Sequence, residues 1–142
     1  MTGTNHYLAG ALVAMVAPHP VLAGAAALVS HIVLDAMPHF GRSSLRVQNL
    51  VVVGDIVCVL VLLGMSWEAN RYLAIICGLI AMSLDLLWIP YYRAQLAGRP
   101  YTLNKLEHWL HALQWGERPW GLAIEIPFGI ALLWLLIHTM MQ

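Results

Sequence analysis

Residues 50–67 read LVVVGDIVCVLVLLGMSW, an apolar run that contains a single charged side chain. At 1.5 Å per residue, a helix of this length reaches about 27 Å, close to the ~30 Å hydrocarbon core of a bilayer. The windows 72–92 and 119–141 are at least as long, and each contains one Asp or Glu and no Lys or Arg. We therefore predict three transmembrane helices, over residues 45–67, 70–92 and 119–141.

The composition agrees with a membrane protein. The chain has 142 residues, of which 61% are hydrophobic and 10% charged, and its mean hydropathy is +0.74. A soluble domain carries about 25% charged residues. The length suits a single membrane domain, residues 1–142. Seven basic and seven acidic residues balance, so the charge indicates no nucleic-acid partner, and the expected partner is the lipid bilayer.

Two further segments are shorter. Residues 6–17 are apolar but reach only about 18 Å as a helix, and Pro18-His19-Pro20 separates them from a second apolar stretch, 21–37. We predict that 6–37 forms a helical hairpin. The segment 102–115 (TLNKLEHWLHALQW) mixes Leu and Trp with Lys, Glu and His, which favours a helix lying at the membrane interface, with Thr102 as its cap. The predicted fold is an all-α integral membrane helical bundle.

The Lys and Arg residues predict the orientation. Only Arg71 falls at one end of the predicted spans. The other six fall at the opposite end: Arg42, Arg46, Arg93, Arg99, Lys105 and Arg118. Cytoplasmic loops carry an excess of Lys and Arg, so we expect a multi-pass protein with its N-terminus in the cytoplasm.

Most histidines and carboxylates fall toward that cytoplasmic end, and they come from separate passes of the chain. An isolated charge at the bilayer centre costs about 2.5–3.5 kcal/mol even on insertion scales, and Asp55 and Asp85 are too deep and too short to reach water. Histidines and carboxylates outnumber the basic side chains at this end, so a bound cation balances them better than salt bridges do. The predicted metal ligands are His6, His31, Asp35, His39, Asp55, Asp85 and His108.

A mixed set of His and carboxylate ligands suits zinc, with manganese or iron as alternatives, and we expect one to three ions. Glu125 and Asp55 are the candidate catalytic groups, since a buried carboxylate can serve as a general base. Arg42 and Arg46 are the candidates for holding a phosphate. Other interpretations stay open: His31 and Asp35 could instead lock the hairpin as a hydrogen-bonded pair, and Asp55 and Asp85 could pair with arginines.

The segment Ser30-His31-Ile-Val-Leu-Asp35-Ala-Met-Pro38-His39 resembles the Ser-His-x-x-x-Asp segment of a family of small bacterial inner-membrane proteins described as membrane-bound metal-dependent hydrolases. Asn5-His6, followed by Gly10, resembles their opening His-x-x-x-Gly. A weaker similarity links the chain to the all-helical zinc-dependent phospholipase C group, which implies His31 as a ligand and Asp35 as a bridge between metals. The Gly-His-Arg-Gly-x-Thr-His segment of many of the membrane relatives does not occur in this sequence. The resemblance implies an inner-membrane location.

These observations favour a membrane-embedded metal-dependent hydrolase. Its substrate would be a lipid or another amphipathic ester or phosphoester at the cytoplasmic leaflet. Two other classes stay open. One is a non-catalytic membrane scaffold whose polar or metal cluster joins the helices. The other is a metal-ion transporter, which we disfavour because the far half of each span lacks the ionisable residues that would mark an ion path.

Overall fold

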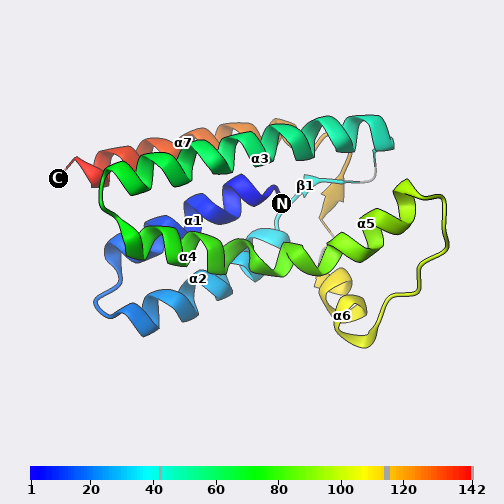
Figure 1. Cartoon of the computed structure of the whole chain (residues 1–142), viewed down its shortest axis with the longest axis horizontal. Coiled ribbons are helices and arrows are strands. Elements are labelled where there is room, and N and C mark those ends of the chain that lie inside the picture. The colour runs from blue at the N-terminus through cyan, green and yellow to red at the C-terminus, as the bar shows by residue number, and fades with distance from the viewer. Residues whose placement is uncertain (42, 114–115, 142) are drawn as a thin grey trace.

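The computed structural model describes residues 1–41, 43–113 and 116–141 (Figure 1). It is all-helical, as predicted, with 77% of the chain in helices. The helices are α1 (Gly3–Val16), α2 (Pro20–Asp35), α3 (Leu45–Glu68), α4 (Tyr72–Met82), the 3-10 helix η1 (Ser83–Trp88), α5 (Ile89–Leu96), α6 (Lys105–Leu113) and α7 (Leu122–Met140). Two short strands, β1 (His39–Phe40) and β2 (Glu117–Arg118), complete the described elements.

In the described part of the chain, three helical stretches are long and apolar enough to cross a membrane. They are α3, the continuous run Tyr72–Leu96 made by α4, η1 and α5, and α7. Large apolar side chains such as Leu60 and Ile130 are more than half exposed on their outer surfaces, which is compatible with contact to lipid. The prediction of three apolar spans is therefore confirmed.

The turn between α3 and α4 follows a common helix-ending pattern. Asn70 adopts a positive φ of 54°, and the Arg71 amide donates back to the Ser66 carbonyl at 2.8 Å. This pairing satisfies carbonyl groups at the end of α3 that have no partner within the helix. The chain can therefore reverse direction within a few residues.

Helix α1 is short but lies at the centre of the bundle, where it packs against α2, α3, α4 and α7. Two glycines let it approach α4 closely. A Cβ on Gly10 would lie 2.4 Å from the Cys77 carbonyl oxygen, and a Cβ on Gly78 would lie 2.6 Å from the ring of Tyr7. Tyr7 is completely buried and donates a hydrogen bond to Ser66 on α3. The hydrophobic core is therefore built around α1.

The start of α1 lies partway along α3 rather than at its end (Figure 1). The backbone amide of Gly3 donates to Asp55, which is ten residues into α3 and so about 15 Å from its first residue. Polar groups at the start of α1 are consequently held deep in the bundle.

A small cap that the sequence did not predict closes the other end of the bundle. Strands β1 and β2 pair in parallel, with His39 opposite Glu117 and Phe40 opposite Arg118. Helix α6 lies near α5 at this end (Figure 1), and the rings of Trp88 and His111 meet edge to face at 5.9 Å. The cap joins the loop after α2 to the segment before α7.

Candidate metal centre

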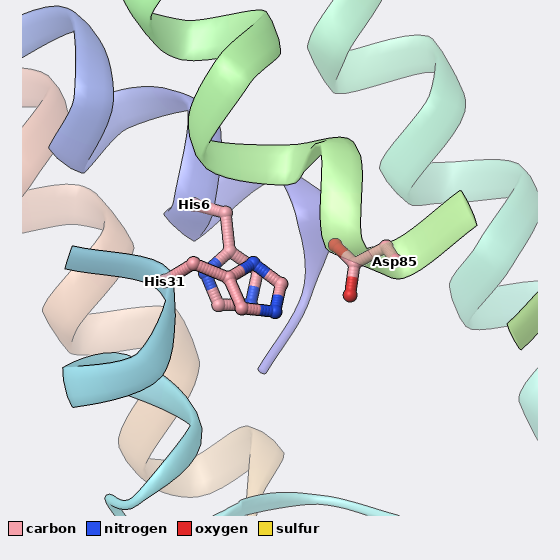
Figure 2. A group of neighbouring side chains, drawn as sticks. All are labelled: His6, His31 and Asp85. Atoms are coloured by element: carbon pink, nitrogen blue, oxygen red, sulfur yellow. The ribbon is translucent and has the colours of Figure 1, made fainter. Parts of the chain in front are cut away.

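His6, His31 and Asp85 form a group that could hold a metal ion. Each offers one ligand atom, and these atoms lie within 4.8 Å of one another. The residues come from α1, α2 and η1, three separate parts of the chain (Figure 2). The two imidazole rings stack with centroids 3.9 Å apart and are almost completely buried, whereas Asp85 is half-buried.

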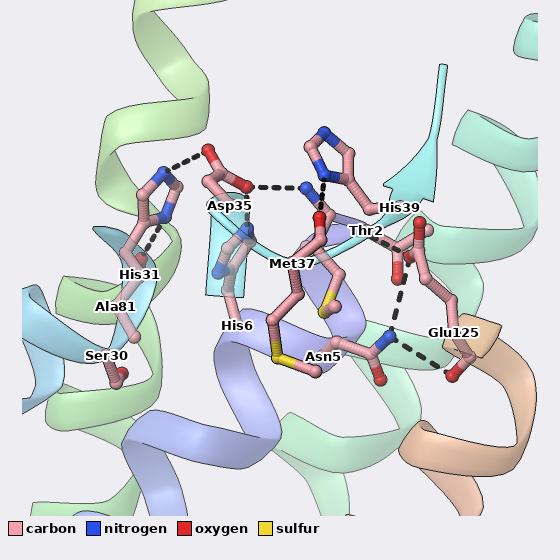
Figure 3. A network of polar contacts seen from close by, with 12 residues as sticks. Thr2, Asn5, His6, Ser30, His31, Asp35, Met37, His39, Ala81 and Glu125 are labelled. Carbon is pink, nitrogen blue, oxygen red and sulfur yellow. Dashed lines mark hydrogen bonds and ion pairs between the residues drawn. The ribbon is translucent and has the colours of Figure 1, made fainter. Parts of the chain in front are cut away.

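The ring of His31 is oriented by the backbone of α4. Its Nδ1 lies 2.7 Å from the Ala81 carbonyl oxygen, so this nitrogen carries the proton and donates it (Figure 3). The Nε2 atom is then directed toward the other polar groups. Metal-binding histidines are commonly held in this way, with one ring nitrogen fixed by a carbonyl and the other left for the ion.

Asp35 lies one helical turn after His31 and contacts both rings. Its Oδ2 is 3.2 Å from His31 Nε2, and its Oδ1 is 3.1 Å from His6 Nε2 (Figure 3). The Met1 amino group also lies 2.5 Å from Oδ1. Asp35 is only 4% exposed. It is therefore placed to fix the positions of both imidazoles.

Within the described residues, His6 Nδ1 and Asp85 Oδ2 are buried without a hydrogen-bond partner. A buried polar atom left unpaired costs about 1–3 kcal/mol. His31 presents a related problem, because both of its nitrogens face acceptor oxygens. That ring can satisfy both contacts only with two protons or with a cation in place of the Nε2 proton. A cation bound by His6, His31 and Asp85 would give each of these nitrogen and oxygen atoms a partner.

Asp55 and Glu125, the predicted catalytic carboxylates, bind the start of α1. Asp55 accepts hydrogen bonds from the backbone amides of Gly3 and Thr4, at 2.9 and 2.7 Å. Glu125 accepts from the Thr2 amide at 2.7 Å and also from the side chain of Asn5 and the amide of Phe40. These amides have no partner within the helix, and the N-terminal end of a helix attracts negative charge. Neither carboxylate belongs to the three-residue group, and their catalytic roles stay predictions.

The remaining predicted site residues lie elsewhere. His39 is buried on β1 with Nδ1 2.7 Å from the Met37 carbonyl oxygen, and His108 is exposed on α6. Arg46 is exposed in the first turn of α3, and Arg42 lies outside the described residues. The structure thus brings together His6, His31, Asp35 and Asp85 of the predicted ligands, and does not bring His39, Asp55 or His108 into the three-residue group.

Helix α6 starts at a capping pair that differs from the expected one. The Glu107 amide donates to Asn104 Oδ1, and the Asn104 amide donates to Glu107 Oε2, so Asn104 takes the role predicted for Thr102. Tyr101 donates its hydroxyl to Glu107 as well, and this hydrogen bond raises the pKa of Tyr101 above its usual value. The Glu107 side chain is buried, and these hydrogen bonds hold it at the start of α6.

Some contributors to the site carry no signal in the sequence. The Ala81 carbonyl that orients His31 is a backbone group, and so are the amides of Thr2, Gly3 and Thr4. No residue type marks them in advance. Only the packing of α1 against α3, α4 and α7 reveals them.

Comparison with protein-family models, with characterised proteins and with solved structures finds no match to this chain. The resemblance to membrane-bound metal-dependent hydrolases therefore stays a prediction.

Proposed function

We propose that this protein is a membrane-embedded hydrolase that depends on a divalent metal ion bound by His6, His31 and Asp85. The observation that carries the proposal is the convergence of these side chains, two of which hold buried polar atoms that have no hydrogen-bond partner among the described residues. Two imidazoles and a carboxylate are the ligand set of several catalytic zinc sites, which leave a further position open. Zinc is our first choice of metal, with manganese and iron as alternatives.

Each residue of the metal centre would have a separate role in the reaction. His31 is held by the Ala81 carbonyl, and Asp35 fixes the rings of His6 and His31 from the other side. A divalent ion in this position would polarise an ester carbonyl or phosphoryl oxygen and activate water for attack. Asp85, which is less buried as a residue than the two histidines, would complete the ligand set from η1. The substrate would be a lipid or another amphipathic ester or phosphoester.

We further propose that the centre opens to the cytoplasmic leaflet of the inner membrane. Arg46, Arg93, Arg99, Lys105 and Arg118 belong to the elements at the α6 end of the bundle, and Arg71 lies in the turn at the other end. The excess of positive charge supports a cytoplasmic position for the α6 end, with α6 lying in the interface.

A non-catalytic scaffold is the second candidate, and one observation favours it. Asp35 already bridges His6 and His31, so the polar cluster joins α1 to α2 without any ion. Such a network stabilises a helix pair when its members are satisfied. The hydrolase requires a metal ion between His6 and Asp85, whereas the scaffold does not.

Elemental analysis of protein purified in mild detergent without chelators tests the proposal. We expect stoichiometric metal in the wild-type protein and in His108→Ala, which removes an exposed histidine on α6. Asp85→Asn keeps the shape of the side chain but removes a ligand charge, and we expect it to lose the metal together with hydrolysis of lipid esters and phosphoesters. Metal without hydrolysis would indicate a metal-stabilised scaffold. Absence of metal from the wild-type protein would indicate a purely polar one.

A further inference from the structure

An apolar groove of about 430 Å³ runs along one side of the bundle. Helix α1 forms its floor through Thr4, Asn5 and Leu8, while α3 and α7 form its two walls. His6, by contrast, contacts Asp35 of α2 and stacks on His31. Among the described residues, the lining of the groove includes no member of the metal centre. The groove is therefore a separate site.

The dimensions of the groove fit one extended hydrocarbon chain. Its α3 wall extends from Val51 to Met65, which corresponds to about 21 Å of helix. Dividing the volume by this length gives a mean cross-section of about 20 Å² for the space open to the centre of a water-sized molecule, so the groove is long and narrow. An acyl or alkyl chain fits along such a groove over its whole length.

The polar side chains of the groove gather near one end. Asp55 and Glu125 lie there with Thr2, Thr4 and Asn5, and apart from Cys58 the rest of the lining is apolar. Both carboxylates already accept hydrogen bonds from the start of α1, but each carboxylate oxygen has a second lone pair, and the groups carry negative charge. This end therefore suits a head group with hydroxyl or ammonium donors, and it repels a phosphate placed next to the chain.

The walls of the groove carry exposed apolar side chains that a bound molecule would cover. Among them, Val61 is 56% and Ile130 is 63% exposed. Apolar surfaces around an unfilled gap lose the dispersion contacts that a close neighbour would supply. In a bilayer, the molecules available beside α3 and α7 are lipids.

We infer that this groove binds a single-chain amphiphile, with its hydrocarbon chain between α3 and α7 and a hydroxyl-bearing or ammonium-bearing head group at Asp55 and Glu125. The inference does not depend on the proposed hydrolase activity, because the groove and the metal centre share none of the residues that the structure describes.

Native mass spectrometry of detergent-purified protein tests the chain site, using two tryptophan variants of adjacent residues on α3. Val61 lines the groove, whereas Leu60 is equally exposed but faces away from it. We expect wild-type protein and Leu60→Trp to retain one lipid each. In Val61→Trp the new ring occupies the space of several methylene groups, so the lipid-bound fraction should fall by about tenfold or more.

Circular dichroism and thermal unfolding of the same samples show that the variants are folded, and their metal content separates this site from the metal centre. Equal lipid retention in the two variants would overturn the inference. Dimers that carry no lipid and dissociate in Val61→Trp would also overturn it, because a second copy of the chain would then be the occupant.

A competition experiment tests the head group. We expect the wild-type protein to retain a monoacylglycerol in preference to a lysophosphatidate of the same chain length, because the carboxylates favour hydroxyl donors over phosphate. Preference for the phosphate-bearing lipid would contradict the orientation that we infer.

Discussion

At the scale of single residues, two aspartates of similar depth have different partners. Asp55 and Asp85 each occur within a long apolar span, and their sequence contexts do not distinguish them. In the structure both oxygens of Asp55 accept backbone amides of α1, whereas Asp85 Oδ2 has no hydrogen-bond partner among the described residues. Asp55 is thus a helix-capping group, and Asp85 retains the capacity to bind an ion.

This difference predicts that Asp55→Asn destabilises the protein without removing metal. The substitution takes away the negative charge at the start of α1 and replaces one acceptor by a donor. We expect the free energy of unfolding to fall by about 0.5–2 kcal/mol, the usual contribution of a helix N-cap or a charge near a helix end. Thermal unfolding in detergent and elemental analysis measure the two effects. Loss of metal with unchanged stability would show that Asp55 is a ligand after all.

The sequence predicted part of the site for clear physical reasons. The His31-x-x-x-Asp35 spacing places both side chains on one face of a helix, and the depth of Asp85 demands a partner. The roles of Asp55 and Glu125 could not be predicted in the same way. They depend on how α3 and α7 are rotated about their axes and on where α1 begins, and spacing along one helix determines neither.

At the scale of elements, α1 is a short helix that behaves as the core of a larger bundle. It has fourteen residues, yet it packs against four other helices. Small residues make this possible, because Gly10 brings its backbone against that of Cys77 on α4. Close backbone approach at small residues is a general feature of helix packing in membranes.

We therefore expect Gly10→Ala to destabilise the protein and Gly64→Ala not to. A Cβ at Gly10 would lie 2.4 Å from the Cys77 carbonyl oxygen and 2.6 Å from the Ala81 Cβ, so the helices must separate. Overpacking of this kind costs about 1–3 kcal/mol. Gly64 has nothing within 4 Å of its Cβ position, and Ala there should be neutral or stabilising by up to about 1 kcal/mol. Thermal unfolding of both variants would reveal an error if their effects were equal.

Hydropathy predicted the long elements well because the thickness of a bilayer fixes their length. The short elements were harder. Strands β1 and β2 have two residues each, too few to show a periodic pattern. Helix α6 begins at Lys105 because Asn104 and Glu107 cap each other, whereas the wider segment 102–115 contains several residues that could cap a helix.

At the scale of the whole molecule, the two ends of the bundle are built differently. The turn between α3 and α4 closes one end with few residues. At the other end lie the β1–β2 pair, α6 and the loop that precedes it (Figure 1). Most of the basic side chains belong to this second end, which is why we propose that it faces the cytoplasm.

Cysteine labelling tests this topology in a variant without the native Cys58 and Cys77. Glu68→Cys at the end of α3 and Arg99→Cys in the loop after α5 replace exposed residues at opposite ends of the bundle. We expect a membrane-impermeant maleimide to label Glu68→Cys from outside intact cells and Arg99→Cys only in inverted vesicles. The reverse pattern would invert the orientation, and labelling of both from one side would rule out a spanning Tyr72–Leu96 run, which lies between the two positions.

The 3-10 helix η1 has a consequence for the approach to Asp85. Six residues at three per turn advance the helical phase by about 120° relative to an α-helix. The buried face of α4, made of the small residues Ala74, Cys77, Gly78 and Ala81, therefore does not continue into α5. Residues three apart are eclipsed in such a helix, which sets Trp88 in line with Asp85 and about 6 Å nearer to α6. Trp88 contacts His111 there, so this aromatic pair joins η1 to α6 one helical turn beyond Asp85. The 3-10 winding of η1 thus places Asp85, a candidate ligand, and the ring of Trp88 on the same face of the helix.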